Sequence, residues 1–243
     1  MHFHVPKPLH GWREFAGEVG IIVIGVGIAL AAEQMLEAAH WTHVVEAEDA
    51  ALQEEIQGNY GSLVVRVMLQ PCIDRRLGEV GEVLRRHDAG LPLGLTGPIG
   101  RPSNFTGSKT TLQMATADQS LSHMPLKRKQ VIFATYGSYD TFAPIAAEER
   151  TGWRVIQALD HSQSLEAADW RDIRKAYYGV VDNNITMKAN LKSDQDGQWL
   201  TGFTSFRAPD RAVLAQSLRT LPYVQNLCRS ALTAGKSTEF ANI

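Results

Sequence analysis

The chain has 243 residues, of which 44% are hydrophobic and 21% charged, and its formal net charge is −2. This length and composition suffice for one membrane segment and one compact domain with its own core. The nearly neutral charge leaves no electrostatic footprint for a nucleic acid, so we expect no nucleic-acid partner.

The N-terminal residues 1–14 are predicted to form a short tail. Pro6, Pro8 and Gly11 interrupt any continuous helix here, and so short a segment cannot build a core of its own.

A nearly unbroken apolar run, from Phe15 to Ala32, follows the tail. The hydrocarbon core of a bilayer requires about 20 apolar residues, with ~17 as a practical minimum, and this run supplies 18. Glu18 lies inside the run and Glu33 borders it, so the uncharged core covers residues 19–32, about 21 Å at ~1.5 Å of helical rise per residue. Local thinning of the bilayer or packing against other helices accommodates such a short core. We therefore expect a transmembrane helix over residues 15–32.

Two tryptophans flank this run. Trp12 precedes it and Trp41 follows it, and the amphipathic ring of tryptophan settles in the interfacial layers of a membrane. We expect Trp12 and Trp41 to be interfacial anchors in the lipid bilayer.

One face of the predicted span carries small residues. Gly17, Gly25 and Ala29 follow one another at intervals of eight and four residues, and Glu18 lies beside them. Small residues let another helix backbone approach closely in lipid, where no hydrophobic force drives association. We expect Gly17, Glu18, Gly25 and Ala29 to contact other transmembrane helices, in a membrane complex or a homo-oligomer. Glu18 is either functional there or an interfacial carboxylate that reaches the headgroups.

Two other interpretations of the apolar run are open. Lys7 and Arg13 would supply the charged segment of a cleaved signal peptide, and Ala29-Leu30-Ala31 offers a small-x-small cleavage site. Against this interpretation, Glu18 interrupts the apolar segment. The run is also compatible with a buried helix of a soluble protein.

The charges around the run predict its orientation. Lys7 and Arg13 precede it, whereas the first basic residue beyond it is Arg66. Seven acids separate the run from Arg66, namely Glu33, Glu37, Glu46, Glu48, Asp49, Glu54 and Glu55. Because basic residues near a span remain cytoplasmic, we expect a cytoplasmic N-terminus and a C-terminal part on the opposite side of the membrane.

Beyond the run, residues 33–70 are predicted to continue as a membrane-proximal helical stalk, since this segment contains no proline and the next one is Pro71. Apolar residues recur there at helical spacing, at Val45, Leu52, Ile56, Tyr60, Leu63 and Val67. We expect Pro71 to kink or end this helix and the apolar stripe to resume as far as about His87.

Residues 71–234 are predicted to form a helical domain that contains one long irregular connection. This connection, Asp88 to Ser108, holds five glycines and three prolines. Its remaining residues are apolar for a linker, so we expect it to lie on the domain or on a partner. The glycines do not have the spacing of a phosphate-binding loop.

Helical periodicity returns after the connection. We expect helices over about 110–121, from Pro125 to about 160, from a cap at Ser164 to about 191, and over 209–232 with a break near Pro222. Residues 235–243 are expected to form a flexible tail. The predicted fold class is therefore all-α, with one N-terminal transmembrane helix that continues into an antiparallel helical bundle.

The segment His4–Gln34, HVPKPLHGWREFAGEVGIIVIGVGIALAAEQ, resembles the opening of a known group of proteins. These are uncharacterised single-pass membrane proteins of Gram-negative bacteria, in which a GE[VI]GIIVIGV-like span precedes a helical domain of unknown function. The resemblance is specific over about thirty residues. It implies an inner-membrane protein with a periplasmic domain, and it carries no catalytic residue that could be transferred.

The chain has two cysteines, Cys72 and Cys228, near the two ends of the predicted domain. Because the bacterial periplasm is oxidising, we expect a disulfide between them. It would close a loop of roughly 155 residues and contribute about 2 to 4 kcal/mol by restricting the unfolded chain. Two small buried thiols are the alternative, which a cytosolic location would favour.

No segment has the spacing of a nucleophile elbow, a Walker loop or an HExxH helix. Asp160, His161 and Ser162 are adjacent, so their side chains point apart on one helix or turn. We therefore expect no catalytic, cofactor-binding or metal-ligating residue, and no cofactor.

The function that these patterns favour is that of a membrane-anchored structural or interaction protein. Such a protein would be an accessory subunit or assembly factor of an inner-membrane complex, or a self-associating anchor. The alternative is a periplasmic ligand-sensing helical bundle that signals through a partner across the membrane.

Overall fold

The computed structural model describes residues 11–103, 105, 107–193 and 209–233. Within these ranges the chain forms α-helices, one 3-10 helix and a single isolated bridge between Leu95 and Leu232, but no strand. The all-α fold class is therefore confirmed. The predicted tail at 235–243 lies outside the described residues.

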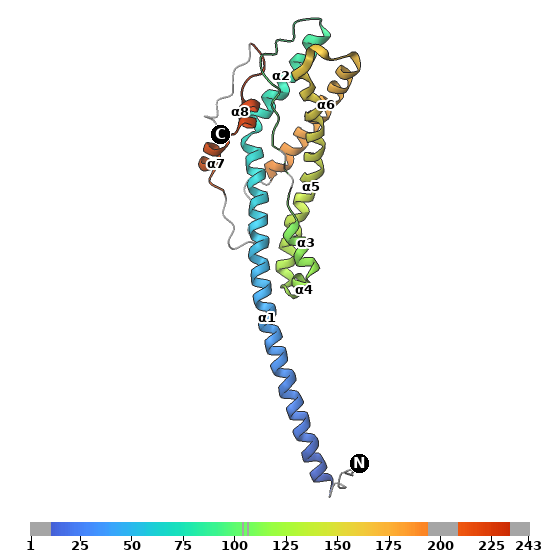
Figure 1. Ribbon diagram of the computed structural model, residues 1–243, viewed down its shortest axis with the longest axis vertical. Helices are drawn as coiled ribbons and strands as arrows, with labels where there is room; N and C mark the ends of the chain where they lie inside the picture. Colours follow the sequence, from blue (N-terminus) through green and yellow to red (C-terminus); the bar gives the residue numbers. More distant parts are fainter. Residues whose placement is uncertain (1–10, 104, 106, 194–208, 234–243) are drawn as a thin grey trace, which may run out of the picture.

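Helix α1 (Trp12–Met68) is one uninterrupted helix of 57 residues, about 86 Å long at ~1.5 Å per residue. Its lower half projects alone from the molecule, and its upper half enters the domain (Figure 1). The predicted span 15–32 and residues 33–68 of the predicted stalk 33–70 therefore belong to the same helix.

Pro71 ends this helix as expected. After Leu69 the chain continues as α2 (Gln70–Asp88), and Pro71 occupies its first turn, where a missing backbone N–H leaves no hydrogen bond unmade. The predicted domain boundary at residue 71 does not separate two packing units, however, because Leu52, Ile56 and Met68 of α1 are already buried in the core.

The long connection after α2 lies on the domain and carries the chain back down. Ile99 and Phe105 are buried, and the backbone N–H of Ser108 donates a 2.8 Å hydrogen bond to Asn59 of α1. Asn59 precedes the end of α2 by 29 residues, or about 44 Å of helix. The connection therefore returns the chain to the lower part of the domain before the next helix begins.

Two short helices, α3 (Thr110–Ala117) and α4 (Ser120–His123), lie beside α1 at the lower end of the domain (Figure 1). The predicted single helix over 110–121 is wrong here, because Gln119 adopts a left-handed backbone conformation with φ of 68°. The Asp118 carboxylate accepts a 2.9 Å hydrogen bond from the backbone N–H of Ser120, which stabilises the break.

The chain then rises as α5 (Leu126–Ile156), turns through η1 (Gln157–Ser164) and descends as α6 (Ala167–Ser193). Helices α5 and α6 are antiparallel, as expected. By contrast, α1–α2 and α5 run parallel, since Asp49, Ile56 and Arg66 of α1 contact Arg128, Tyr139 and Glu149 of α5 in the same order. The predicted antiparallel bundle required α5 to run opposite to α1–α2. It runs parallel instead, because the connection after α2 leads the chain back to the lower end of the domain before α5 begins.

The predicted cap of α6 at Ser164 is wrong. The Ser164 hydroxyl donates instead to the carbonyl of His161, at 2.9 Å. The Asp169 carboxylate accepts from the backbone N–H of Glu166 at 2.8 Å, and this contact closes the first turn of α6.

Two short helices complete the described domain: α8 lies beside α2, and α7 lies next to α8 (Figure 1). Helix α7 (Arg211–Arg219) begins after Asp210, whose carboxylate accepts from the backbone N–H groups of Ala212 and Val213. Helix α8 (Pro222–Cys228) starts at Pro222. The predicted break near Pro222 is therefore confirmed.

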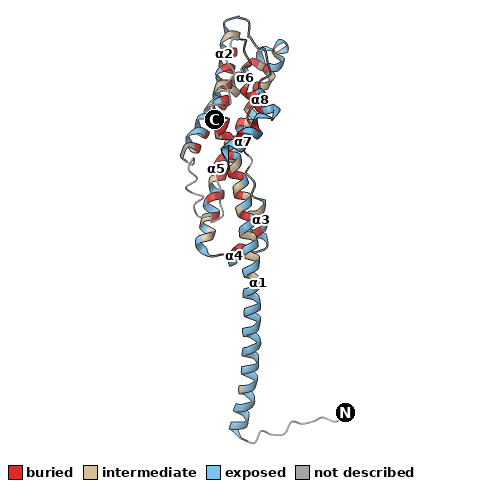
Figure 2. Cartoon of the chain, turned by 90° about the vertical axis from the view of Figure 1, so that its left-hand side faces the viewer, coloured by how far each residue is buried: buried red, intermediate tan, exposed pale blue. Residues whose placement is uncertain are grey.

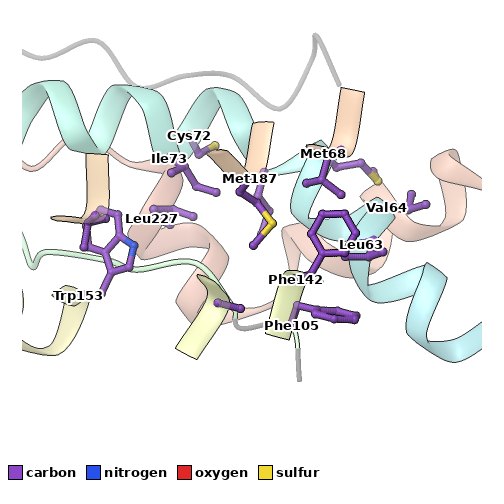
Figure 3. Packing of buried hydrophobic residues seen from close by; sticks show 14 of the residues in the cluster. Leu63, Val64, Met68, Cys72, Ile73, Phe105, Phe142, Trp153, Met187 and Leu227 are labelled. Atoms are coloured by element: carbon purple, nitrogen blue, oxygen red, sulfur yellow. The ribbon is translucent and has the colours of Figure 1, made fainter. Parts of the chain in front are cut away.

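The core lies in the upper half of the molecule, where Figure 2 shows the buried positions, while the lower half of α1 is exposed. Its packing joins α1, α2, α5, α6 and α8 around large apolar side chains (Figure 3). Those labelled there are Leu63, Val64, Met68, Cys72, Ile73, Phe105, Phe142, Trp153, Met187 and Leu227.

Replacing Gly152 with Ala should destabilise the domain. A Cβ at this position would lie 2.3 Å from Cγ2 of Val180, across the contact between α5 and α6. Overpacking of this kind costs about 1–3 kcal/mol, so the Tm measured by circular dichroism should fall. In the matched control, Gly179→Ala, the Cβ meets no neighbouring atom within 4 Å and should stabilise α6 by ~0.5–1 kcal/mol. Equal Tm values for the two variants would contradict this packing.

Candidate functional site

The lower half of α1 is an apolar helix without a partner in the described part of the chain. Its large apolar side chains are exposed, among them Phe15, Val19, Ile21, Ile22, Val23, Ile24, Val26, Ile28, Leu30, Met35 and Leu36. By length and composition α1 is able to cross a membrane, and its most apolar 18-residue stretch is 0% buried. Burial in the core of the described domain is thereby excluded for this segment.

The small residues on this helix face open space. A Cβ built on Gly17 or Gly25 would meet no neighbouring atom within 4 Å, and Glu18 and Ala29 are also exposed. The predicted contact of Gly17, Glu18, Gly25 and Ala29 with another membrane helix stays a prediction.

The two flanking tryptophans have different surroundings. Trp12 is exposed at the start of α1, whereas Trp41 stacks on His123 of α4 with a centroid distance of 3.6 Å and an interplanar angle of 11°. This stacking attaches the lower end of the domain to α1. The role of both rings as interfacial anchors stays a prediction.

Above Trp41, two carboxylates of α1 bind the neighbouring elements. Asp49 accepts hydrogen bonds of 2.5 and 2.9 Å from Arg128 at the start of α5. Glu55 accepts from the Tyr136 hydroxyl at 2.5 Å, from the Ser108 hydroxyl at 2.6 Å and from the backbone N–H of Thr111 at 3.1 Å. Burial raises the pKa of the Glu55 carboxyl, but these hydrogen bonds outweigh it and hold the pKa below its usual value. Asp49 and Glu55, which in the sequence indicated only the orientation of the span, thus join α1 to the domain.

A polar cluster crosses the middle of the domain. Arg66 of α1 is only 3% exposed and donates to Glu149 of α5 and to Asn184 of α6, both at 2.9 Å. It also donates to Gln70 at 2.8 Å. Burial lowers the pKa of the Arg66 guanidinium, and the charges of Glu149 and Asp74 oppose this effect. A buried guanidinium needs every one of these partners, so the cluster fixes how α1, α5 and α6 align.

Asp74 of α2 extends this cluster to the surface. It accepts from Asn184 at 2.9 Å, from Lys188 at 2.8 Å and from Gln70 at 2.7 Å. Burial raises the pKa of the Asp74 carboxyl, but the hydrogen bonds from Lys188, Asn184 and Gln70 outweigh it and lower the pKa. Sequence reasoning missed this cluster, although Asn184 was already visible as a polar residue on an apolar face of its helix.

The C-terminal segment is clamped to α2. Cys72 and Cys228 lie at disulfide distance, with Sγ atoms 2.04 Å apart. Next to them Arg76, 0% exposed, donates to the carbonyls of Asn226 at 2.6 Å and of Arg229 at 2.5 Å, where α8 ends and its carbonyls lack helical partners. Glu79 pairs with Arg76 at 2.8 Å and accepts from the Ser230 hydroxyl at 2.7 Å. The sequence indicated the cysteine pair but not the arginine beside it.

Two hollows lie at the end of the domain that is remote from the apolar half of α1. One, of about 690 Å³, is lined by Leu95, Gly97, Pro98 and residues 159–164. The other, of about 550 Å³, is lined by residues 98–103 and by Gln157, Asp160, Tyr223 and Asn226.

The sequence Asp160-His161-Ser162 lines the first hollow. Asp160 accepts a 2.7 Å hydrogen bond from the backbone N–H of Ile99, so its carboxylate holds the connection in place. Within the described ranges no hydrogen bond joins Asp160, His161 and Ser162, and no group of three His, Cys, Asp or Glu residues could hold a metal ion.

In comparisons with protein-family models, with curated proteins and with solved structures, nothing matches this chain.

Replacing Glu149 with Leu should destabilise the protein strongly, because it leaves the charge of Arg66 buried without its partner. Loss of one member of a buried ion pair costs about 3–5 kcal/mol, measurable by urea denaturation. The double variant Arg66→Met/Glu149→Leu should recover most of this loss. The control Glu82→Gln, at a partly exposed carboxylate that pairs with Arg85 and Arg86, should change stability far less. A single Glu149 variant as stable as this control would refute the role of the cluster.

The protein should lose stability in acid partly through Asp74. Because folding lowers the pKa of Asp74, its contribution is present above the unfolded-state pKa of about 3.9 and is lost as pH falls through the folded-state value. The unfolding free energy should decline from about pH 5 downward, and Asp74→Asn should flatten this decline. Urea titrations across pH measure both slopes. Asp182→Asn, at an exposed position of α6, should keep the slope of the parent chain, and an unchanged slope in Asp74→Asn would count against the assignment.

Proposed function

We propose that this protein is a membrane-anchored structural or interaction protein, an accessory subunit or assembly factor of an inner-membrane complex or a self-associating anchor. One observation carries the proposal: the apolar half of α1 contains no buried residue, yet it is continuous with a helix that enters the domain core. Water disfavours so much exposed apolar surface, whereas a bilayer accommodates it with every backbone group hydrogen-bonded within the helix.

Two observations support a cytoplasmic N-terminus and a periplasmic domain. Lys7 and Arg13 precede the apolar run, while acids alone follow it as far as Arg66. Cys72 and Cys228 lie at disulfide distance, and disulfides persist in the oxidising periplasm rather than in the bacterial cytosol. The resemblance of residues 4–34 to single-pass proteins of Gram-negative bacteria agrees with this placement.

Interaction is favoured over catalysis by what the exposed parts of the chain offer. The open space at Gly17 and Gly25 leaves room for another helix backbone. Within the domain, the buried side chains of Arg66 and Arg76 hold neighbouring elements together.

The two hollows favour a second candidate function, a periplasmic ligand-sensing bundle that signals through a partner. They lie side by side, since Pro98 and Asp160 line both. A ligand there would contact the connection, η1 and α8 together.

Fractionation of cells that express the intact chain tests the membrane anchor. The protein should remain in the membrane pellet after alkaline carbonate and require detergent for release. Mass spectrometry of the purified chain should find residues 15–32 intact, and a non-reducing gel should show faster migration than a reducing one because of the Cys72–Cys228 bridge. Recovery in the aqueous fraction, or a mature chain that begins near Ala32, would refute the anchor.

Replacing Gly25 with Leu should disrupt contacts with other membrane helices. A branched side chain keeps another backbone from approaching the small-residue face, so the complex purified in mild detergent should become smaller by size-exclusion chromatography with light scattering. Val26→Leu, one position away and already large, is the matched control and should keep the size of the parent complex. If both variants form complexes of the parent size, Gly25 does not contribute to the interface.

A further inference from the structure

The lowest part of the domain is the corner between α4 and α5, residues Ser122–Lys127, here called the corner (Figures 1 and 2). Met124 is buried and fixes it from inside, while Ser122, His123, Pro125, Leu126 and Lys127 are exposed. Leu126 is 67% exposed. A large apolar side chain thus projects beside a lysine at the end of the domain nearest the apolar half of α1.

The height of the corner above the apolar segment follows from the helix. His123 stacks on Trp41, which follows Ala32 by nine residues, or about 14 Å of rise. The headgroup layer is about 5–8 Å thick on each side of the hydrocarbon core. If hydrocarbon ended at Ala32, the corner would lie just above the headgroups.

The exposed side chains of α1 indicate a deeper position. Met35 and Leu36, 75% and 74% exposed, extend the apolar segment beyond Glu33, and residues 19–32 alone cover only about 21 Å of a core of about 30 Å. With the boundary at Leu36, Glu33 lies three residues, or about 4.5 Å, below it, where its carboxylate still reaches the headgroups. Trp41 lies five residues, or about 7.5 Å, above the boundary. Trp41, His123 and the corner then lie within the headgroup layer, where amphipathic rings settle.

The charges of the corner match an anionic surface. Lys127 is exposed, and Lys129 follows it on the first turn of α5, with Nζ 3.5 Å from the Ser122 carbonyl. Arg128 is bound to Asp49 of α1, so it holds the corner against α1. Two acids lie nearby: Asp118 at the junction of α3 and α4, and Glu48 of α1, whose pKa is raised by burial and by the charge of Asp118.

From these observations we propose that the corner is a second membrane contact, which binds the phosphate groups of anionic phospholipids through Lys127 and Lys129. Leu126 and Trp41 enter the interfacial layer beside them. This inference rests on the proposed membrane anchor, because only an anchored α1 brings the corner to the bilayer. The domain then stands on the membrane at two points and its orientation is fixed.

Depth-dependent quenching in proteoliposomes of the full chain tests the proposal. An environment-sensitive fluorophore is attached to the thiol of Leu126→Cys. Cys72 and Cys228 are not labelled, because they are paired with each other. The quencher is a spin label on the lipid headgroups. Quenching at position 126 should be at least about twofold stronger than in Ile185→Cys. Ile185 is the control because it is exposed but lies far from the corner. Its neighbour Asn184 binds Arg66, and Arg66 lies about 38 Å above Trp41 along α1. Quenching no stronger at 126 than at 185 overturns the proposal.

Lipid composition and charge reversal test the role of the lysines. Quenching at 126 should increase when phosphatidylglycerol is added to phosphatidylcholine, and Lys127→Glu should abolish this increase, because each basic residue near an anionic surface changes binding about fivefold. Lys175→Glu, at an exposed position of α6, should preserve it. An increase that survives Lys127→Glu/Lys129→Glu, with Tm unchanged, overturns the assignment to these lysines.

A label in the span separates this inference from the proposed function. Ile22→Cys should be quenched by spin-labelled acyl chains. Quenching at 22 without quenching at 126 refutes the corner contact alone, whereas its absence at 22 refutes the membrane anchor and the corner contact with it.

Discussion

The continuity of α1 is the constraint on which the rest of the structure depends. No proline interrupts the helix from Trp12 to Met68, so its backbone hydrogen bonds run without a break from the exposed apolar half into the domain core. The two halves have opposite environments but share one rigid rod. The environment that binds the apolar half therefore also fixes the position and orientation of the domain, because no flexible linker separates the two halves of α1.

The domain is built around this rod by contacts that tolerate little displacement. The connection after α2 returns the chain so that α5 rises parallel to α1, and the guanidinium of Arg66 is then shared between α1, α5 and α6. A buried charge is costly unless its partners are all in place. A shift of one helical turn would separate Arg66 from Glu149 and Asn184, so the polar cluster selects one register among many that apolar packing alone would allow.

The C-terminal segment closes the same structure from the other side. Cys72 and Cys228 join α2 to α8, and Arg76 binds the carbonyls at which α8 ends. The exposed features of the described chain differ from these buried contacts. The lower half of α1 is an apolar helix with small residues, and above it the corner exposes Leu126 and Lys127. Both suit an environment of lipid and membrane helices, and they support the proposed role in anchoring and interaction.

Local patterns in the sequence determined the all-helical class, the apolar run and the breaks at Pro71 and Pro222, because hydrophobic period and proline act over a few residues. The sequence also predicted that Cys72 and Cys228 pair with each other. Local patterns did not predict the parallel course of α5, the left-handed Gln119, or the partners of Arg66 and Arg76. Periodicity tells which face of a helix is buried but not what covers it, and a charged residue looks solvated until a distant segment desolvates it. The path of the connection and the burial of two arginines were therefore decided by contacts between residues far apart in the chain, which only the tertiary structure contains.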